Sequence, residues 1–491
     1  ASSLIPAVII FALPEERRAL RTTLNLGGAV LKLTLVAVML LGVRAGADYG
    51  FRHEILQGIE FAFEMDALAL LFVTLSAALW LLTTLYAVGY LEGSPHRSRF
   101  FGFFSLCVTA TVGLAMAANL FTFFVFYEVL TLTTYPLVAH RGTPESLRAA
   151  AVYLAYTLVG GALLLTGIIW LRGLTGPIEF TSGGALGDVG DEAATQLRIA
   201  FGLLVAGVGV KAALVPLHGW LPRAMIAPAP VSALLHAVAV VKAGAFGLVR
   251  VVYDVFGVER AQALGLLTPL AILAAVTIVW GSLRALTQSE LKPRLAFSTV
   301  SQVSYIALGV ALFGPIGTIG GLVHLVHQGI MKITLFFCAG NYAEALGIHR
   351  IEDLDGVGRR MPLTTAAFTI GALGMMGAPL TAGAVSKEWL SRGAEAADMK
   401  WASHVLLASS LLNVAYFGPI LWRAWLRGPP PAWPEEAIPR RGWREIDWLL
   451  LLPPLVTAVA TVAAALLAGT DQSPLAWAQL ITAREYRNLE P

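Results

Sequence analysis

The apolar stretch between residues 207 and 250 contains four side chains that can bind and release a proton: Lys211, His218, His236 and Lys242. A lysine at the centre of a bilayer costs about 2.5–3.5 kcal/mol on the insertion scale, so such residues are retained where they have a function. Prolines interrupt the same stretch, and broken helices beside buried ionisable groups form ion sites in membrane proteins. The pattern predicts a proton-transfer site. The alternative is that the lysines lie at helix ends and extend toward the interface.

A single acid occupies the apolar segment 120–139. This is Glu128, with Thr131 and Tyr135 at i+3 and i+7 on the same helical face. A carboxylate in hydrocarbon must be protonated, paired or hydrated. Glu128 is therefore either a proton-binding group or a neutral acid with a local hydrogen bond.

A polar stripe runs along the segment 318–344, where His324, Gln328 and Lys332 recur at i, i+4 and i+8 and His327 adjoins them. Glutamine hydrogen-bonds water but does not take up a proton at neutral pH. A proton route through this segment therefore uses His324, His327 and Lys332, or passes by water. The preceding segment adds small polar side chains that serve either as packing contacts or as partners for water: Ser298, Ser301, Gln302 and Ser304.

Composition identifies the surroundings of these residues. The chain has 491 residues, of which 57% are hydrophobic and 13% are charged, whereas soluble proteins carry about 25% charged residues. The net charge of +3 and two cysteines add little, and no metal-ligand spacing, nucleotide motif or iron–sulfur spacing is present. We therefore expect an all-α polytopic membrane protein without cofactor, metal or nucleic-acid partner. We also expect no signal peptide, because no basic segment with a cleavage site begins the chain.

About fourteen apolar segments are long enough to be transmembrane helices, and the first is short enough to be interfacial. They are 3–13, 24–43, 65–91, 101–118, 120–139, 149–171, 198–218, 230–253, 263–283, 295–313, 318–344, 362–391, 402–422 and 447–468.

The seventh and twelfth segments each combine a proline break with a lysine. In the twelfth, Gly377, Pro379 and Gly383 predict an unwound stretch, and Lys387 follows it. The two breaks lie five spans apart, so the units that contain them face opposite ways, as in inverted repeats. We expect N-terminal helices in 1–118, a first repeat in 101–254 and a second repeat in 263–423. A cytoplasmic loop, the last helix and a short polar tail would form 424–491.

Basic residues predict the orientation. Loops after odd-numbered segments hold 19 lysines and arginines, whereas the opposite side holds 9. Because basic loops stay in the cytoplasm, we expect both termini outside the cell membrane.

The motif order resembles the proton-conducting antiporter-like subunits of respiratory complex I, membrane-bound hydrogenases and Mrp-type cation/proton antiporters. The matching runs are VKAALVPLHGWLP, PAPVSALLHA, VVKAG and SELKPRLAFSTVSQ, within roughly residues 60 to 420. The resemblance implies that Glu128 pairs with Lys211. The sequence departs from the family pattern at Arg223, where an aspartate is usual, and at Gln328, where a histidine is usual.

The resemblance implies a proton-translocating subunit of a multi-subunit Na+/H+ antiporter in the plasma membrane, together with other membrane subunits. The short tail favours the subunit-D type of the Mrp antiporters. Three alternatives stay open: a pumping subunit of a complex I-like or hydrogenase complex, an energy-coupling subunit for inorganic-carbon uptake, and a non-conducting scaffold. The expected proton-transfer residues are Glu128, Lys211, His218, His236, Lys242, His324, His327, Lys332 and Lys387, with Lys387 as the exit gate.

Overall fold

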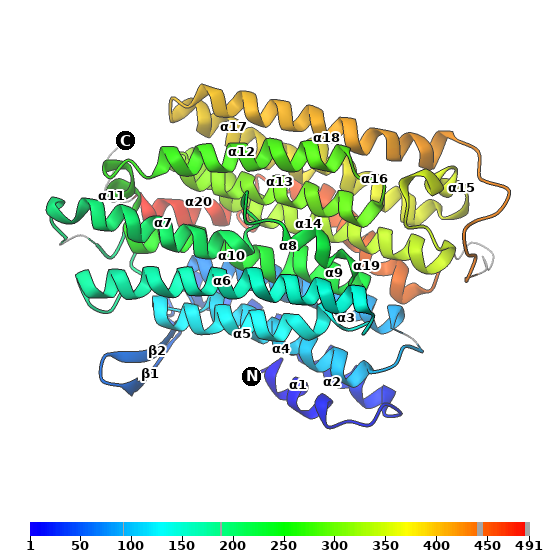
Figure 1. The fold of residues 1–491 in the computed structure, drawn as a ribbon, viewed down its shortest axis with the longest axis horizontal. Coiled ribbons are helices and arrows are strands. Elements are labelled where there is room, and N and C mark those ends of the chain that lie inside the picture. The colour runs from blue at the N-terminus through cyan, green and yellow to red at the C-terminus, as the bar shows by residue number, and fades with distance from the viewer. Residues whose placement is uncertain (92, 187–188, 439–444, 487–491) are drawn as a thin grey trace.

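A computed structural model describes residues 1–91, 93–186, 189–438 and 445–486 of the chain. Most of its long helices run side by side along the longest axis of the molecule (Figure 1). Eleven described helices are long and apolar enough to cross a membrane, which confirms the predicted polytopic helical fold. Four of the arginines used to predict the orientation lie outside the described residues: Arg440, Arg441, Arg444 and Arg487.

The N-terminal half contains the first seven predicted segments. The helices are α1 (Leu4–Phe11), α2 (Arg18–Arg44), α3 (Ala67–Tyr90), α4 (Arg97–Ala115), α5 (Leu120–Val138), α6 (Pro144–Thr175) and α7 (Ala194–Lys211). The first is too short to cross alone, since its 8 residues extend roughly 12 Å against a hydrocarbon layer of about 30 Å.

The eighth segment is a composite span at the centre of the bundle, and all of it is buried. It consists of α9 (Ala229–Ala233), a π-helical turn (Leu234–Val238), α10 (Val240–Arg250) and a second π-helical turn (Val251–Phe256). The short helices α8 (Trp220–Arg223) and α11 (Val258–Ala263) flank it. The π-helical turns are not visible in the hydrophobic pattern, because one extra residue per turn leaves the segment equally apolar.

The C-terminal half surrounds the long, buried helix α14 (Pro315–Leu346). The other helices are α12 (Leu267–Leu286), α13 (Leu291–Ala311), α15 (Val357–Arg360), α16 (Pro362–Met376), α17 (Ala382–Ala396), α18 (Lys400–Leu426), α19 (Trp448–Leu466) and α20 (Pro474–Glu485). The expected polar tail instead forms α20, which packs against α3 and α14. Its Trp477 Nε1 donates a hydrogen bond of 2.7 Å to the Ala67 carbonyl.

Both predicted breaks are present. Helix α7 ends at Lys211 and α8 begins at Trp220, while the Trp220 indole donates to the Val210 carbonyl at 2.7 Å. Helix α16 ends at Met376 and α17 begins at Ala382. Between them Gly377 adopts a left-handed φ of +88°. The first break is buried from Ala212 to Leu214, whereas Pro379 and Leu380 of the second are exposed.

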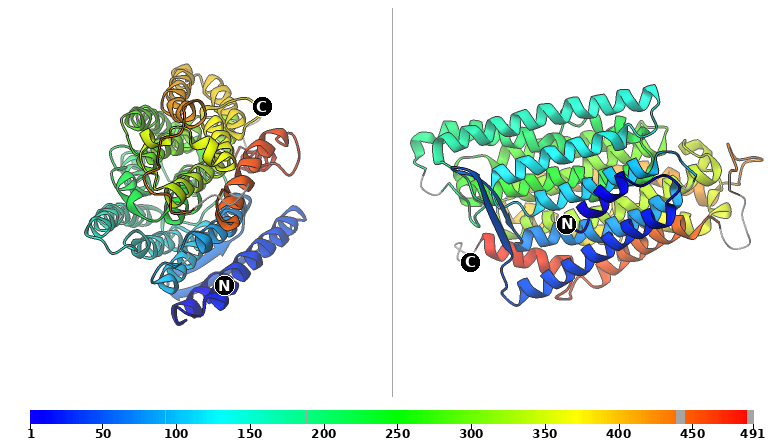
Figure 2. Two further views of the ribbon diagram at one scale, coloured as in Figure 1. Left: turned by 90° about the vertical axis from the view of Figure 1, so that its right-hand side faces the viewer. Right: turned by 90° about the horizontal axis from the view of Figure 1, so that it is seen from below.

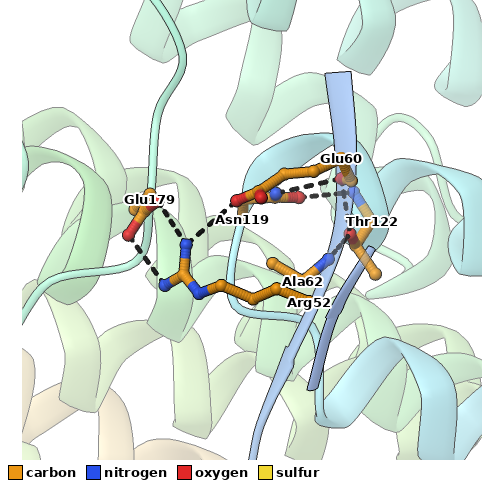
Figure 3. A network of polar contacts seen from close by, with 6 residues as sticks. All are labelled: Arg52, Glu60, Ala62, Asn119, Thr122 and Glu179. Atoms are coloured by element: carbon orange, nitrogen blue, oxygen red, sulfur yellow. Dashed lines mark hydrogen bonds and ion pairs between the residues drawn. The ribbon is translucent and has the colours of Figure 1, made fainter. Parts of the chain in front are cut away.

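A β-hairpin that we did not predict joins α2 to α3. Strands β1 (Gly50–Leu56) and β2 (Ile59–Glu64) pair antiparallel, and Figure 3 shows how they are attached to α5 and to the segment after α6. Arg52 contacts Glu60 at 2.9 Å and Glu179 at 2.6 Å, and the Arg52 guanidinium holds the pKa of Glu179 below its ordinary value. The Ala62 amide donates to Thr122 Oγ1 at 2.9 Å. The described C-terminal end lies at the same end of the bundle as this hairpin (Figures 1 and 2).

Candidate functional site

Four of the predicted proton-transfer residues are lysines that lie within the helical bundle. Lys211, Lys242 and Lys332 are 0% exposed and Lys387 is 8% exposed. Within the described part of the chain, the hydrogen bonds that these four ammonium groups donate all end on neutral oxygens of backbone carbonyls or hydroxyls. The contrast with Arg250 is clear, because that side chain is paired with Asp66 at 2.6 Å and Asp254 at 2.9 Å.

Lys211, the last residue of α7, reaches across to α5. Its Nζ donates to the Tyr127 carbonyl and, at 2.8 Å, to Thr131 Oγ1. It also lies 3.2 Å from the centre of the Tyr127 ring. Lys211 thus binds one residue that precedes Glu128 in the sequence of α5 and one that follows it.

The Glu128 carboxylate points toward α6, so the direct contact with Lys211 that we expected is not made among the described residues. Its Oε1 is buried without a hydrogen-bond partner there. A Cβ at Gly161 would lie 2.1 Å from this oxygen, so the carboxylate occupies the space that the glycine leaves open. The half-buried Glu128 thus belongs to the same helix, α5, whose Tyr127 carbonyl and Thr131 hydroxyl bind the buried Lys211.

Lys242 connects the composite span to α14, since its Nζ donates to the Leu325 carbonyl at 2.7 Å. The π-helical turn before α10 contains His236, whose ring stacks on Phe336 with centroids 4.4 Å apart. Neither ring nitrogen of His236 has a partner among the described residues. Both side chains therefore approach α14 from the same span.

Helix α14 presents its polar stripe to two neighbouring helices. His324 Nδ1 hydrogen-bonds Ser386 Oγ of α17 at 2.8 Å, and its ring stacks on Tyr305 of α13. Lys332 donates to Ser298 Oγ of α13. His327 lies between them with both ring nitrogens unpartnered in the described residues.

Lys387 binds the broken end of α16. Its Nζ donates to the Met375 carbonyl at 2.7 Å and to Ser410 Oγ at 3.1 Å. In an uninterrupted helix the Met375 carbonyl would accept from the amide of residue 379, but Pro379 has no N–H. Because α16 ends at Met376, the Met375 carbonyl has no partner within the helix, and both Lys387 and the Asn413 amide donate to it.

His218 lies apart from these contacts. It is half-buried, and its Nε2 accepts a bond of 3.3 Å from Trp280 Nε1, which belongs to a side chain that is 45% exposed. The break predicted in this segment separates His218 from Lys211, because α7 ends at Lys211. The end of α7 turns His218 toward the edge of the bundle.

Hydrogen bonds join α7 to α5 and α10 to α14. Helix α7 also packs on α10, and α14 packs on α13 and α17, so the helices that carry the remaining residues form a connected series. Helices α13 and α14 also carry buried side chains whose polar atoms have no partner among the described residues: Gln302, His327 and Gln328. No group of three His, Cys, Asp or Glu residues that could hold a metal ion is present in the described chain.

Sequence reasoning missed the acceptors of the lysines. The carbonyls of Tyr127, Leu325 and Met375 carry no sequence signal, because every residue has a carbonyl. Only the proline four residues after Met375 could have marked that oxygen as free. Ser386 precedes Lys387 directly and was the available clue for the contact with His324.

Comparisons with known proteins agree with this architecture. The family model described as NADH:quinone oxidoreductase/Mrp antiporter, TM, matches residues 117–413. The model described as NADH-ubiquinone oxidoreductase (complex I), chain 5 N-terminus, matches residues 57–101.

Two relatives and one solved structure illustrate the range. NADH-quinone oxidoreductase subunit N of Desulforudis audaxviator is 35% identical over 418 residues, which cover 82% of this chain and 81% of that protein. The A/B subunit of the probable K(+)/H(+) antiporter of Rhizobium meliloti is 32% identical over 67% of this chain, which spans only 33% of that relative. A chain in the structure of the Mrp complex from Dietzia sp. DQ12-45-1b has a TM-score of 0.86 and 25% identity, covering 99% of this chain and 96% of its own. The chain therefore belongs to the NADH:quinone oxidoreductase/Mrp antiporter family of polytopic membrane subunits.

Proposed function

We propose that this chain translocates protons as a subunit of a multi-subunit Na+/H+ antiporter. The observation that carries the proposal is the set of four buried lysines that bond neutral oxygens. A buried ammonium group without an acid beside it has no opposite charge to offset the loss of its hydration. A carbonyl or hydroxyl oxygen accepts a bond from a charged or a neutral amine alike, so these lysines keep their positions when they lose a proton.

The proposed route crosses the bundle from α5 to α17. Glu128 and Lys211 form the coupling pair at one end. His236, Lys242, His324 and Lys332 transfer protons through the middle, and Lys387 is the gate at the other end. The unpartnered polar atoms of His327, Gln302 and Gln328 offer hydrogen bonds to water in the intervals. His218 contributes at the edge of this route, beside Trp280.

We infer further that residues 101–254 and 263–423 are inverted repeats. Each contains one of the two breaks, and each break has a buried lysine beside it, Lys211 in one and Lys387 in the other. In this arrangement the two gating lysines are equivalent positions of the two repeats.

The same site suits a second function, the membrane arm of a quinone-reducing complex. The similarity to subunit N over 82% of the chain favours it, whereas the similarity to part of a probable K(+)/H(+) antiporter and to an Mrp complex favours the antiporter. In either function the chain works beside other membrane subunits. We place it in the plasma membrane with both termini outside.

The test uses everted membrane vesicles that contain the complete complex. A pH gradient is established by respiration and followed with a fluorescent probe, and Na+ is then added. The antiporter predicts that Na+ collapses the gradient in wild-type vesicles but not in Lys242→Met vesicles. Lys400→Met, at an exposed position, is the matched control and should behave as wild type.

Two results would contradict the proposal. Wild-type response to Na+ in Lys242→Met vesicles would exclude the lysine route. The chain would instead belong to the redox complex if Na+ leaves the gradient unchanged and quinone reduction by the purified complex generates a gradient.

A further inference from the structure

A groove of about 650 Å³ opens between α2, α3, α14 and α19, and the start of α20 closes one end of it. Helix α2 stands at the margin of the bundle (Figure 2), and its exposed side chains outside the groove include Val38, which is 56% exposed. On the other rim, Val459 of α19 is 66% exposed. The groove therefore lies on a side of the molecule that faces hydrocarbon.

The lining of the groove changes in character along its length. Its walls are apolar along most of this length, with Leu40, Leu75, Val326 and Val456 among the residues that form them. Polar side chains gather at the end near α20, where Arg44, Gln472 and Ser473 are found. An apolar slot with a polar end matches a molecule that has a tail and a headgroup.

The length of the slot fits one leaflet. The lining residues of α3 extend from Leu71 to Leu82, which at 1.5 Å per residue is roughly 16 Å. Half of the hydrocarbon layer of a bilayer is about 15 Å. One acyl chain reaching to mid-membrane therefore has the right length for the groove.

Arg44 supplies a charge at the polar end. Its Nη2 donates to the Asp471 carbonyl at 2.7 Å, and its guanidinium lies 5.5 Å from the centre of the Trp477 ring. No carboxylate pairs with it among the described residues, so its positive charge is available to a ligand. A guanidinium has five N–H donors and binds phosphate in a bidentate manner.

We propose that this groove binds an anionic phospholipid of the leaflet at the hairpin end of the bundle. One acyl chain lies between α2 and α19, and the phosphate contacts Arg44. The tail packs on Val326 and Ile330 of α14, the helix that also carries His327. The lipid thus supports the central helix of the proposed proton route from outside, whichever complex the chain serves.

The experiment measures lipid retention. Purified protein is reconstituted with equal amounts of phosphatidylglycerol and phosphatidylcholine, and bound lipid is counted by native mass spectrometry. Wild type should retain phosphatidylglycerol preferentially. Arg44→Gln should lose this preference by about tenfold, the effect of roughly 1.4 kcal/mol of binding energy, while Arg44→Lys should keep part of it. Ala78→Phe should exclude both lipids, because the new ring fills the groove.

Arg392→Gln is the control, since Arg392 is exposed and pairs with Glu388 away from the groove. It should bind both lipids as wild type does. Equal retention of the two lipids by wild type, or unchanged preference in Arg44→Gln, would overturn the proposal. Retention of no lipid, with a segment of a neighbouring protein cross-linked into the groove instead, would overturn it as well.

Discussion

Replacing Lys387 with methionine should abolish proton translocation and leave the protein folded. The reason is the second donor at the Met375 carbonyl, the Asn413 Nδ2, which lies 2.8 Å away. When Lys387 loses its ammonium group, that buried oxygen keeps a hydrogen bond. The substitution also removes the desolvation penalty of a buried ammonium group that has only neutral partners. The free energy of unfolding should therefore change by less than about 1 kcal/mol.

A double-mutant cycle isolates this reasoning. Asn413→Leu alone leaves the Met375 carbonyl with Lys387, but Lys387→Met with Asn413→Leu removes both donors. A buried carbonyl without a partner costs about 1–3 kcal/mol. The loss of unfolding free energy in the double variant should therefore exceed the sum of the losses in the two single variants by about that amount. These losses are measured by unfolding in mixed detergent micelles.

Transport is measured on the same variants in vesicles with a fluorescent pH probe. Lys387→Arg keeps the charge but does not deprotonate at working pH, so it should be inactive, whereas Lys387→Glu keeps a titratable group and should be partly active. Full transport by Lys387→Met or Lys387→Arg, in normally assembled complex, would show that Lys387 never carries the proton. If the stability losses of the two single variants simply add up to that of the double variant, Lys387 and Asn413 do not share one acceptor.

Three further predictions concern the other end of the route and the hairpin. Glu128→Gln and Lys211→Ala should each abolish transport in vesicles without loss of assembly, and near-full activity in either would remove that residue from the route. Gly161→Ala places a Cβ where Glu128 Oε1 now lies, so transport should fall by about tenfold, or about 1.4 kcal/mol, and an unchanged rate would show that the carboxylate position does not matter. The pKa of Glu179 is lowered by Arg52, so its contribution is present above the ordinary glutamate range and is lost as pH falls through the lowered value. The protection of the hairpin amides against exchange, taken relative to the intrinsic exchange rate at each pH, should fall toward acid pH, and the Glu179→Gln hairpin should not show this dependence.

Segment length and residue type were sufficient to predict most of the fold. Runs of apolar residues located the spans because a bilayer demands about 20 of them, and Pro379 located the break in the twelfth span because proline lacks an amide hydrogen. The same reasoning identified Lys211, Lys242, Lys332 and Lys387, since few residues are as costly in hydrocarbon.

Tertiary contacts were beyond these rules. The direction of the Glu128 side chain depends on the space at Gly161 in another helix, and the position of His218 depends on where α7 ends. The hairpin had a local signal that we did not use, the alternation before and after Gly58, which has a φ of +73° in the two-residue turn. Helix α20 was missed because its burial comes from partners far away in the chain, such as Ala67.

The contact between Lys387 and the Met375 carbonyl has a consequence for natural variation. The acceptor belongs to the backbone, so many side chains at position 375 would present the same oxygen. Position 377 has no such freedom, because its φ of +88° lies in the left-handed region and a Cβ there would lie 3.0 Å from Lys387 Cδ. Among relatives that use this gate, we expect position 375 to vary in residue type while glycine persists at position 377. A collection of such sequences would therefore show the gate more clearly at position 377 than at the residue whose oxygen the lysine binds.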